Sequence, residues 1–139
     1  MTPQHYLTAP EGPALNYLME DAYSLEHGIY IKEAKAGYAA LGVEIKPYMV
    51  NAHGSVHGGL IALLADDVTG VASHTLAQAS VTMGMTVNYI KAALNCQTLT
   101  AIGKIRHGGR RTHVIDFEIS DQDQQLIASG TATYFVIEN

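Results

Sequence analysis

Residues 57–75 constrain this chain most, because apolar residues there occupy nearly the whole circumference of a helix. The apolar positions are Leu60, Ile61, Leu63, Leu64, Val68, Val71 and Ala72. A helix that is apolar on nearly every side is buried rather than laid on a surface. The sequence therefore predicts a fold in which other elements enclose this helix.

Alternating apolar residues on both sides of this segment predict strands. We expect them at 28–33, 38–46, 79–90, 97–106, 112–120 and 126–137. Short turns between consecutive strands indicate an antiparallel meander. One buried helix wrapped by about six strands is an α+β architecture. We expect a single domain over 1–139, whose lead-in, 1–27, contains a short amphipathic helix at 13–26.

The composition excludes several classes of protein. With 47% apolar and 15% charged residues, the 139-residue chain can bury a core, unlike a disordered protein. Its single cysteine, Cys96, excludes an intramolecular disulfide and fits a reducing compartment. Because neither a signal-peptide pattern nor an apolar run of about 18 residues occurs, we expect a cytoplasmic protein that spans no membrane. The net charge of −5 argues against nucleic acid as a partner.

Positive charge is concentrated in one short window. Lys104, Arg106, Arg110 and Arg111 lie within eight residues and include every arginine of the chain. An acidic protein with one basic cluster is typical of a binder of a small anionic ligand. The alternative is a solvated turn, because His107-Gly108-Gly109 lies between two alternating stretches and predicts a hairpin.

A second His-Gly-Gly sequence, His57-Gly58-Gly59, opens the predicted central helix. Glycine in a helix costs about 1 kcal/mol relative to alanine, so two in the first turn need a reason. The N–H groups of a helix N-terminus are free and carry partial positive charge. Glycine would let a ligand oxygen approach them, as in an oxyanion hole. The alternative is a tight loop packed against the sheet.

Asp66 and Asp67 interrupt the middle of the apolar helix. A buried carboxylate is costly unless it is paired, neutralised or needed for function. Apolar residues flank the pair on both sides, so we expect at least one of the two to face inward, in a structural or a functional role.

Gly58 and Asp66 cannot serve one site within a single helix. They are eight residues apart, about 12 Å along the axis and about 80° around it. Reacting groups must come within about 3–3.5 Å. If both belong to an active site, that site lies between two copies of the chain related by a two-fold axis.

Other catalytic centres fit less well. Zinc is disfavoured because Gly54 and Ser55 separate His53 from His57, and no glutamate follows His53 as in the H-E-x-x-H pattern. Ser55 is not in a G-x-S-x-G elbow. Cys96 has no neighbour that would activate it.

Five residues lie on a predicted loop and on the buried helix that follows it, ahead of antiparallel strands: Asn51, His57, Gly58, Gly59 and Asp66. This pattern resembles the hotdog-fold acyl-coenzyme A (acyl-CoA) thioesterases of the phenylacetate-degradation type. The asparagine precedes His57 by six residues and the aspartate follows it by nine. The resemblance covers roughly residues 28–137, with 86–91, 109–112 and 124–137 matching later parts of the family. The chain departs from the family at 91–93, which lack a common proline.

This resemblance implies a long helix wrapped by a curved sheet, dimers that pair into one continuous sheet, and often tetramers. It implies hydrolysis of acyl-CoA without a metal, a serine nucleophile or a separate cofactor, since coenzyme A (CoA) is part of the substrate. Asp66 matches the acidic residue that acts as general base or nucleophile, and its position relative to His57 favours it over Asp67. Gly58 matches the N–H that polarises the thioester carbonyl.

The resemblance also implies supporting roles for further residues. His57 and Asn51 would shape the carbonyl pocket, and Thr82 matches a hydroxyl that helps to hold water. CoA would be bound by Gly59, with Arg110 and Arg111 contacting the nucleotide phosphates.

Two other functions share this fold. A non-catalytic acyl-CoA binder would gain nothing from a carboxylate beside the thioester, and a hydratase or dehydratase pairs histidine and carboxylate at a different spacing. The acyl group, aromatic or fatty, stays open, because the candidate pocket walls Val68, Met83, Met85 and Tyr89 suit both.

Overall fold

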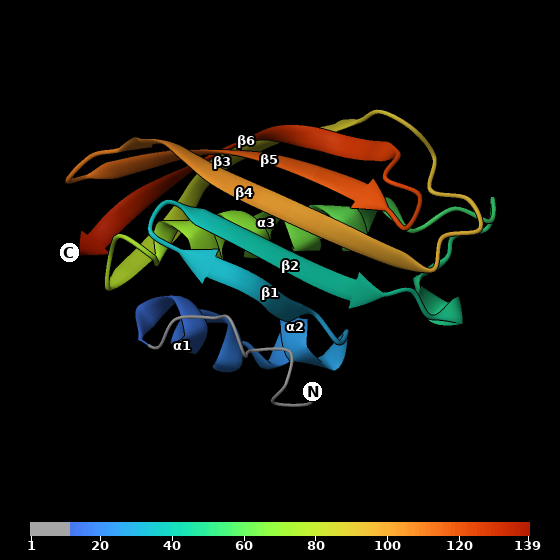
Figure 1. The fold of residues 1–139 in the computed structure, drawn as a ribbon, viewed down its shortest axis with the longest axis horizontal. Helices are drawn as coiled ribbons and strands as arrows, with labels where there is room; N and C mark the ends of the chain where they lie inside the picture. Colours follow the sequence, from blue (N-terminus) through green and yellow to red (C-terminus); the bar gives the residue numbers. More distant parts are fainter. Residues whose placement is uncertain (1–11) are drawn as a thin grey trace.

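The computed structural model describes residues 12–139 (Figure 1). In chain order the elements are α1 (Pro13–Met19), α2 (Ala22–Glu26), β1 (Tyr30–Lys35), β2 (Tyr38–Glu44), the 3-10 helix η2 (Pro47–Met49), α3 (Gly58–Ser73), β3 (Ala79–Tyr89), β4 (Thr98–Gly108), β5 (Thr112–Asp121) and β6 (Leu126–Glu138). The first eleven residues, on which the expected absence of a signal peptide rests, lie outside the described residues. Within residues 12–139, no helix is both long and apolar enough to cross a membrane.

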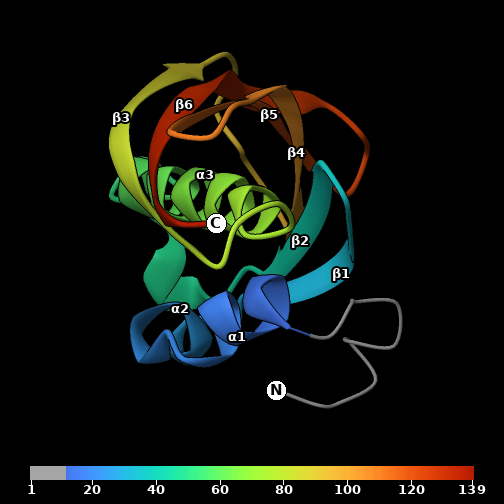
Figure 2. The ribbon, with the colours of Figure 1, turned by 90° about the vertical axis from the view of Figure 1, so that its left-hand side faces the viewer.

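The six strands form one antiparallel sheet in the order β1-β2-β4-β5-β6-β3. Figure 2 shows this sheet curving over α3, with α1 and α2 on the side that the sheet leaves open. The predicted α+β class, a long helix wrapped by a curved antiparallel sheet, is confirmed.

The position of β3 differs from the predicted meander. β4, β5 and β6 follow one another across the sheet, but β3 pairs with β6 at the far edge instead of with β4. The chain between Tyr89 and Thr98 is an irregular connection, with Asn95 at φ 50°, rather than a tight turn. Because this connection is long enough to pass from the sheet edge to its middle, strands consecutive in sequence are not neighbours here.

The lead-in contains two helices rather than the single predicted helix. α1 ends at Met19, and the Asp21 carboxylate then accepts a hydrogen bond from the Ser24 N–H at 3.2 Å. Aspartate at such a position starts a new helix, because it provides an acceptor for an N–H that the helix itself leaves free.

The predicted burial of the central helix is confirmed. Leu64, Val68 and Val71 have no exposed surface. β4 lies so close to α3 that a Cβ at Gly103 would be 3.1 Å from the Val68 carbonyl oxygen. Glycine at this strand position therefore lets the helix and the sheet touch.

β3 leaves an apolar edge of the sheet open. It is the last strand in the sheet order, and Val81, Met83 and Tyr89 on it are 48%, 61% and 56% exposed. An edge strand presents unpaired N–H and C=O groups, which proteins usually cover or pair. Such an edge is suited to pairing with another chain.

Candidate active site

The loop before α3 is held by Asn51. Its side-chain Oδ1 accepts hydrogen bonds from the His53 N–H at 2.9 Å and from the Ser55 N–H and Oγ at 3.2 Å each. With three donors already on this oxygen, Asn51 shapes the loop that leads to His57.

His57, Gly58 and Gly59 form the N-terminus of α3. The His57 ring caps the helix, since its Nδ1 accepts a hydrogen bond from the Gly59 N–H at 3.0 Å. The Gly58 N–H donates to no acceptor among residues 12–139. Gly58, rather than Gly59, therefore carries the free amide that a ligand oxygen could bind.

One cavity joins this amide to the end of β3. It has a volume of about 310 Å³, and Asn51, Gly58, Tyr89 and Lys91 contribute to its lining. The Tyr89 hydroxyl donates to the Gly58 carbonyl oxygen at 2.9 Å, and a Cβ at Gly58 would touch the Tyr89 ring at 3.5 Å. Tyr89, at the open edge of the sheet, thus forms one wall beside the free amide.

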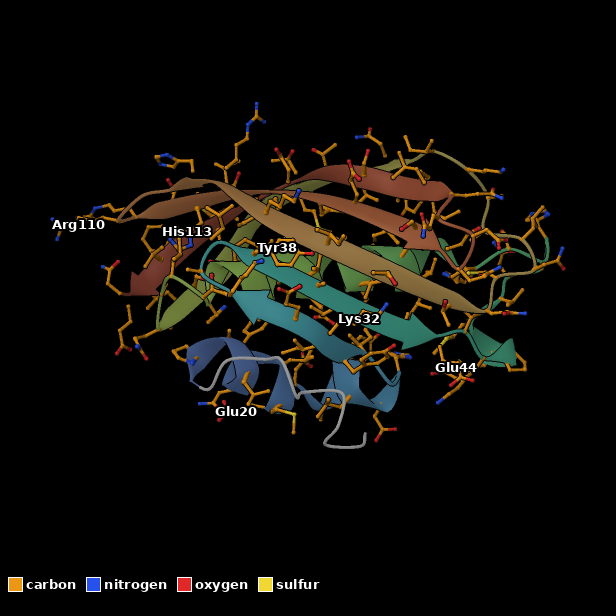
Figure 3. All side chains as sticks on the ribbon, viewed as in Figure 1. Glu20, Lys32, Tyr38, Glu44, Arg110 and His113 are labelled. Atoms are coloured by element: carbon orange, nitrogen blue, oxygen red, sulfur yellow. The ribbon has the colours of Figure 1, made fainter. Side chains whose placement is uncertain are left out.

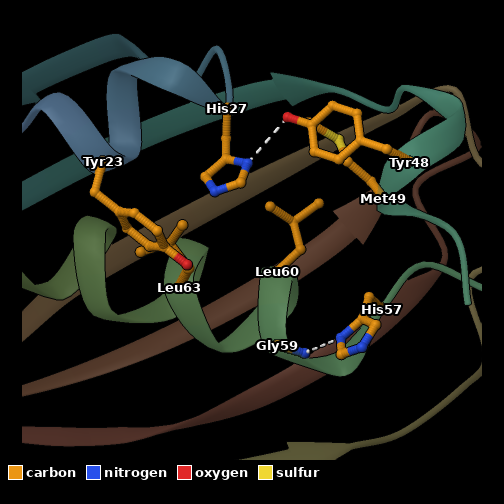
Figure 4. Close-up of a pocket in the computed structure, with 8 residues that line it drawn as sticks. All are labelled: Tyr23, His27, Tyr48, Met49, His57, Gly59, Leu60 and Leu63. Atoms are coloured by element: carbon orange, nitrogen blue, oxygen red, sulfur yellow. Dashed lines mark hydrogen bonds between the residues drawn. The ribbon is translucent and has the colours of Figure 1, made fainter.

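A second cavity of about 240 Å³ lies beside His57 and Gly59 at the start of α3 (Figure 4). It is lined by Tyr23, His27, Tyr48, Met49, His57, Gly59, Leu60 and Leu63. The His27 ring nitrogen Nδ1 is 3.0 Å from the Tyr48 hydroxyl. Tyr23 of α2, His27 at the end of α2 and Tyr48 of η2 were not among the predicted site residues. No local pattern in the sequence shows that these segments meet the start of α3.

Asp66 lies two turns farther along α3 and faces β3 and β6. The Thr82 hydroxyl of β3 donates to Asp66 Oδ1 at 2.8 Å, and the Tyr134 hydroxyl of β6 lies 3.0 Å from the same oxygen. The structure thus brings the predicted Asp66 and Thr82 together. Sequence reasoning missed Tyr134, although the period-two pattern of 126–137 places it on the inward face with Ala132 and Val136.

Asp67 faces away from Asp66, toward α1 and α2. It is 1% exposed, and its Oδ2 is buried without a hydrogen-bond partner. Burial raises the pKa of this carboxyl to about 7, although a hydrogen bond with Ser24 opposes the shift. The expectation that at least one of the two carboxyls faces inward is confirmed, and Asp67 is the fully buried one.

The basic turn lies at the other end of α3 from Gly58. A Cβ at Gly108 would be 3.0 Å from Leu76, which follows the last turn of α3, and Figure 3 shows Arg110 projecting from the tip of this hairpin. β4 continues through His107 and Gly108, so the turn is shorter than predicted. Within one chain, therefore, the helix N-terminus, Asp66 and the basic turn lie at successive positions along α3 and do not meet.

The remaining predicted features form no further site among residues 12–139. Val68 is fully buried, and Met83 is exposed on the edge strand, so the two do not form one pocket wall with Tyr89. Burial raises the pKa of the Cys96 thiol to about 11, so the thiol stays protonated at neutral pH. Among residues 12–139, no group of three or more His, Cys, Asp or Glu is placed to hold a metal ion.

Comparison with known proteins relates this arrangement to one family. The model of the Thioesterase superfamily matches residues 53–128. Acyl-coenzyme A thioesterase PaaI of Escherichia coli K12 is 33% identical over 108 residues, which cover 78% of this chain and 77% of the relative. The solved structure of E. coli PaaI, from the phenylacetic acid degradation operon, has a TM-score of 0.86 at 30% identity, covering 91% of this chain and 92% of that one.

Solved structures from Streptococcus pneumoniae TIGR4 are also similar. A hypothetical thioesterase with coenzyme A has a TM-score of 0.81 at 28% identity, covering 90% of this chain and 98% of that one. A mutant of a hypothetical thioesterase with alanine in place of an aspartate has a TM-score of 0.74 at 27% identity, covering 80% of this chain and 92% of that one. A second mutant, with alanine in place of a threonine, has a TM-score of 0.73 at 26% identity, covering 80% of this chain and 91% of that one. The two replaced positions are sixteen apart, as are Asp66 and Thr82.

Proposed function

This chain belongs to the thioesterase superfamily, and we propose that it hydrolyses acyl-CoA thioesters at a site built from the N-terminus of α3 and from Asp66. The observation that carries the proposal is the pair of complementary groups on α3. One is the free Gly58 N–H beside a cavity, and the other is a half-buried carboxylate held by two hydroxyls. The relation to PaaI and to a CoA-bound thioesterase supports the substrate class.

The chemistry follows from these two groups. The Gly58 N–H, reinforced by the helix dipole, polarises the thioester carbonyl and stabilises the oxyanion that develops on it. As general base, Asp66 takes a proton from the attacking water, and this proton passes to the leaving thiolate. As nucleophile, Asp66 attacks the carbonyl carbon and forms an acyl–aspartyl anhydride, which water then cleaves to give the free acid and restore the carboxylate. The C–S bond then breaks and the CoA thiolate leaves, with no metal or separate cofactor required.

The site is shared between two copies of the chain. Gly58 and Asp66 lie about 12 Å apart along α3, too far to act on one carbonyl. The open, apolar edge of β3 and the neighbouring Tyr89 give a second copy a surface on which to pair. We propose a dimer in which α3 lies near the two-fold axis, so that Asp66 of one copy acts beside Gly58 of the other, and a dimer of dimers beyond it.

The basic turn fits the same dimer. Arg110 and Arg111 lie at the opposite end of α3 from Gly58 in their own chain, and a two-fold axis perpendicular to α3 brings that end toward the other copy's helix N-terminus. We propose that these arginines contact the phosphates of CoA. The two cavities beside His57 and Gly58 leave room for an aromatic or a fatty acyl group. We also propose that the chain is a single hotdog domain and that it acts in the cytoplasm.

Thiol release from a panel of aryl and fatty acyl-CoA thioesters tests the activity. Hydrolysis of at least one member supports the proposal. Binding of acyl-CoA with no hydrolysis of any member would instead identify a non-catalytic binder.

Mixing two inactive variants tests the shared site. Asp66→Ala removes the carboxylate and Gly58→Pro removes the N–H, so each homodimer is expected to be inactive. A heterodimer contains one intact half-site and should recover activity. Proven heterodimers without recovery would contradict the shared site.

Replacing Arg110 and Arg111 with alanine tests the CoA contact. Contacts made equally to substrate and transition state affect KM rather than kcat, so KM for acyl-CoA should rise severalfold with kcat nearly unchanged. The matched control is the corresponding pantetheine thioester, which lacks the nucleotide phosphates and should be hydrolysed alike by both proteins.

A further inference from the structure

The Tyr134 hydroxyl is buried directly behind Asp66. Tyr134 has no exposed surface, and its hydroxyl lies 2.7 Å from the Asp66 carbonyl oxygen, 3.0 Å from Asp66 Oδ1 and 3.0 Å from Thr69 Oγ1. Burial raises the pKa of this phenol far above its usual range, so the hydroxyl keeps its proton as a donor.

The neighbouring hydroxyl does not compete for the carboxylate. Thr69 Oγ1 has acceptors of its own, the Ala65 carbonyl oxygen at 2.9 Å and the Asp66 carbonyl oxygen at 3.1 Å. When Thr69 donates to these backbone oxygens, the single Tyr134 proton is shared between the Asp66 carbonyl oxygen at 2.7 Å and Asp66 Oδ1 at 3.0 Å. A hydrogen bond to an ionised acceptor is about twice as strong as a neutral one, which favours Oδ1.

The two oxygens of the Asp66 carboxylate therefore differ. Oδ1 receives the Thr82 hydroxyl from the exposed side and the Tyr134 hydroxyl from the buried side. Oδ2 accepts no hydrogen bond from residues 12–139. Two donors on one oxygen oppose rotation of the carboxylate and leave the other oxygen open to substrate.

We infer that Tyr134 is a positioning residue that, together with Thr82, holds Asp66 Oδ1 so that Oδ2 is the oxygen that takes part in thioester hydrolysis. This inference rests on the proposed function. Tyr134 itself touches no substrate, because it is buried on the far side of the carboxylate. Its effect is exerted through the orientation of Asp66 alone.

Tyr134→Phe keeps the ring and removes the hydroxyl. For a thioester that the wild-type protein hydrolyses, kcat should fall about 10- to 100-fold, the range for loss of a hydrogen bond to a charged group, while KM stays within about twofold. Tyr38→Phe is the matched control, since it removes a tyrosine hydroxyl from β2, away from Asp66, and should leave both constants unchanged.

The Asp66→Asn background separates positioning from a general structural role. If Tyr134 acts through the carboxylate, Tyr134→Phe should change the small remaining rate of Asp66→Asn less than about twofold. An equal loss of rate in both backgrounds, or an unchanged kcat in Tyr134→Phe alone, would overturn the inference.

A folding failure of Tyr134→Phe would leave the decision to Thr82, which is exposed. Thr82→Val should lower kcat in the same range, and Thr82→Ser should restore it. A Thr82→Val variant with the wild-type kcat would contradict the inference that hydroxyl donors to Oδ1 orient the Asp66 carboxylate. A wild-type protein that hydrolyses no acyl-CoA would overturn the proposed function and the inference with it. Normal wild-type activity with an unaffected Tyr134→Phe would overturn only the inference.

Discussion

The two faces of α3 carry the same side chain in opposite surroundings. Asp66 is half-buried beside β3 and β6, and two hydroxyls meet one of its oxygens. Asp67 is almost fully buried beneath α1 and α2, with one oxygen unpartnered and its pKa raised to about 7. Neighbouring residues on a helix point about 100° apart, so one position decides which environment a carboxylate enters.

The difference shows that a carboxylate in an apolar helix is not by itself a sign of catalysis. Burial favours the neutral form of Asp67 and raises its pKa to about 7, and its position under two helices keeps this carboxyl away from substrate. A carboxylate that keeps an open oxygen beside hydroxyl donors can attack or take up a proton. The contrast is testable on each face.

The largest expected effect is on catalysis at the Asp66 face. Asp66→Asn keeps the shape of the side chain but cannot act as base or nucleophile, so kcat should fall by roughly 10²–10⁴. Asp67→Asn is the matched control and should keep most of the activity. Thiol-release kinetics on the same acyl-CoA measure both. Equal losses in the two variants would erase the functional distinction between the faces.

The next effect is on the pH dependence of stability at the Asp67 face. The carboxyl has a pKa of about 7 in the folded protein and an ordinary value of 3.8, so between these pH values the folded protein binds the extra proton. Its contribution to the free energy of unfolding is therefore intact below about pH 4 and is lost as the pH rises to 7. The full loss is at most about 4 kcal/mol.

Asp67→Asn cannot ionise and should remove this dependence. Urea unfolding at pH 5 and pH 8 should show a larger gain of the variant over the wild type at pH 8. Taking the difference between the two proteins cancels the opposite contribution of the buried His74 and His113, whose pKa values burial lowers. A gain that is the same at both pH values would show that Asp67 does not titrate in this range.

The smallest expected effect compares two glycines of α3. A Cβ at Gly70 would be 2.6 Å from ring carbons of Tyr17, which stacks on His74 with ring centroids 4.2 Å apart. Overpacking costs about 1–3 kcal/mol and alanine in a helix regains about 1, so Gly70→Ala should lower the free energy of unfolding by about 1 kcal/mol.

Gly58→Ala is the counterpart, because its Cβ would meet Tyr89 at an ordinary 3.5 Å. Chemical denaturation should show little loss of stability there. If Gly58→Ala lowered the free energy of unfolding more than Gly70→Ala, the conclusion that α3 is packed more tightly at Gly70 than at Gly58 would be wrong.

By itself, the sequence determined the elements and what they require locally. The apolar circumference of 57–75 predicts a buried helix, and period-two alternation predicts strands, because these patterns report which faces of one element leave water. The separation of Gly58 from Asp66 also follows from sequence, since helix geometry converts residue number into distance.

Only the tertiary structure decided which of these pieces meet. It placed β3 at the sheet edge beside β6, put Asp67 rather than Asp66 under the lead-in helices, and brought Tyr134 to a carboxylate 68 residues earlier in the chain. The physical reason is that contacts between distant segments depend on how whole elements pack together. A local pattern of hydrophobicity specifies that a face is buried, but not which partner buries it.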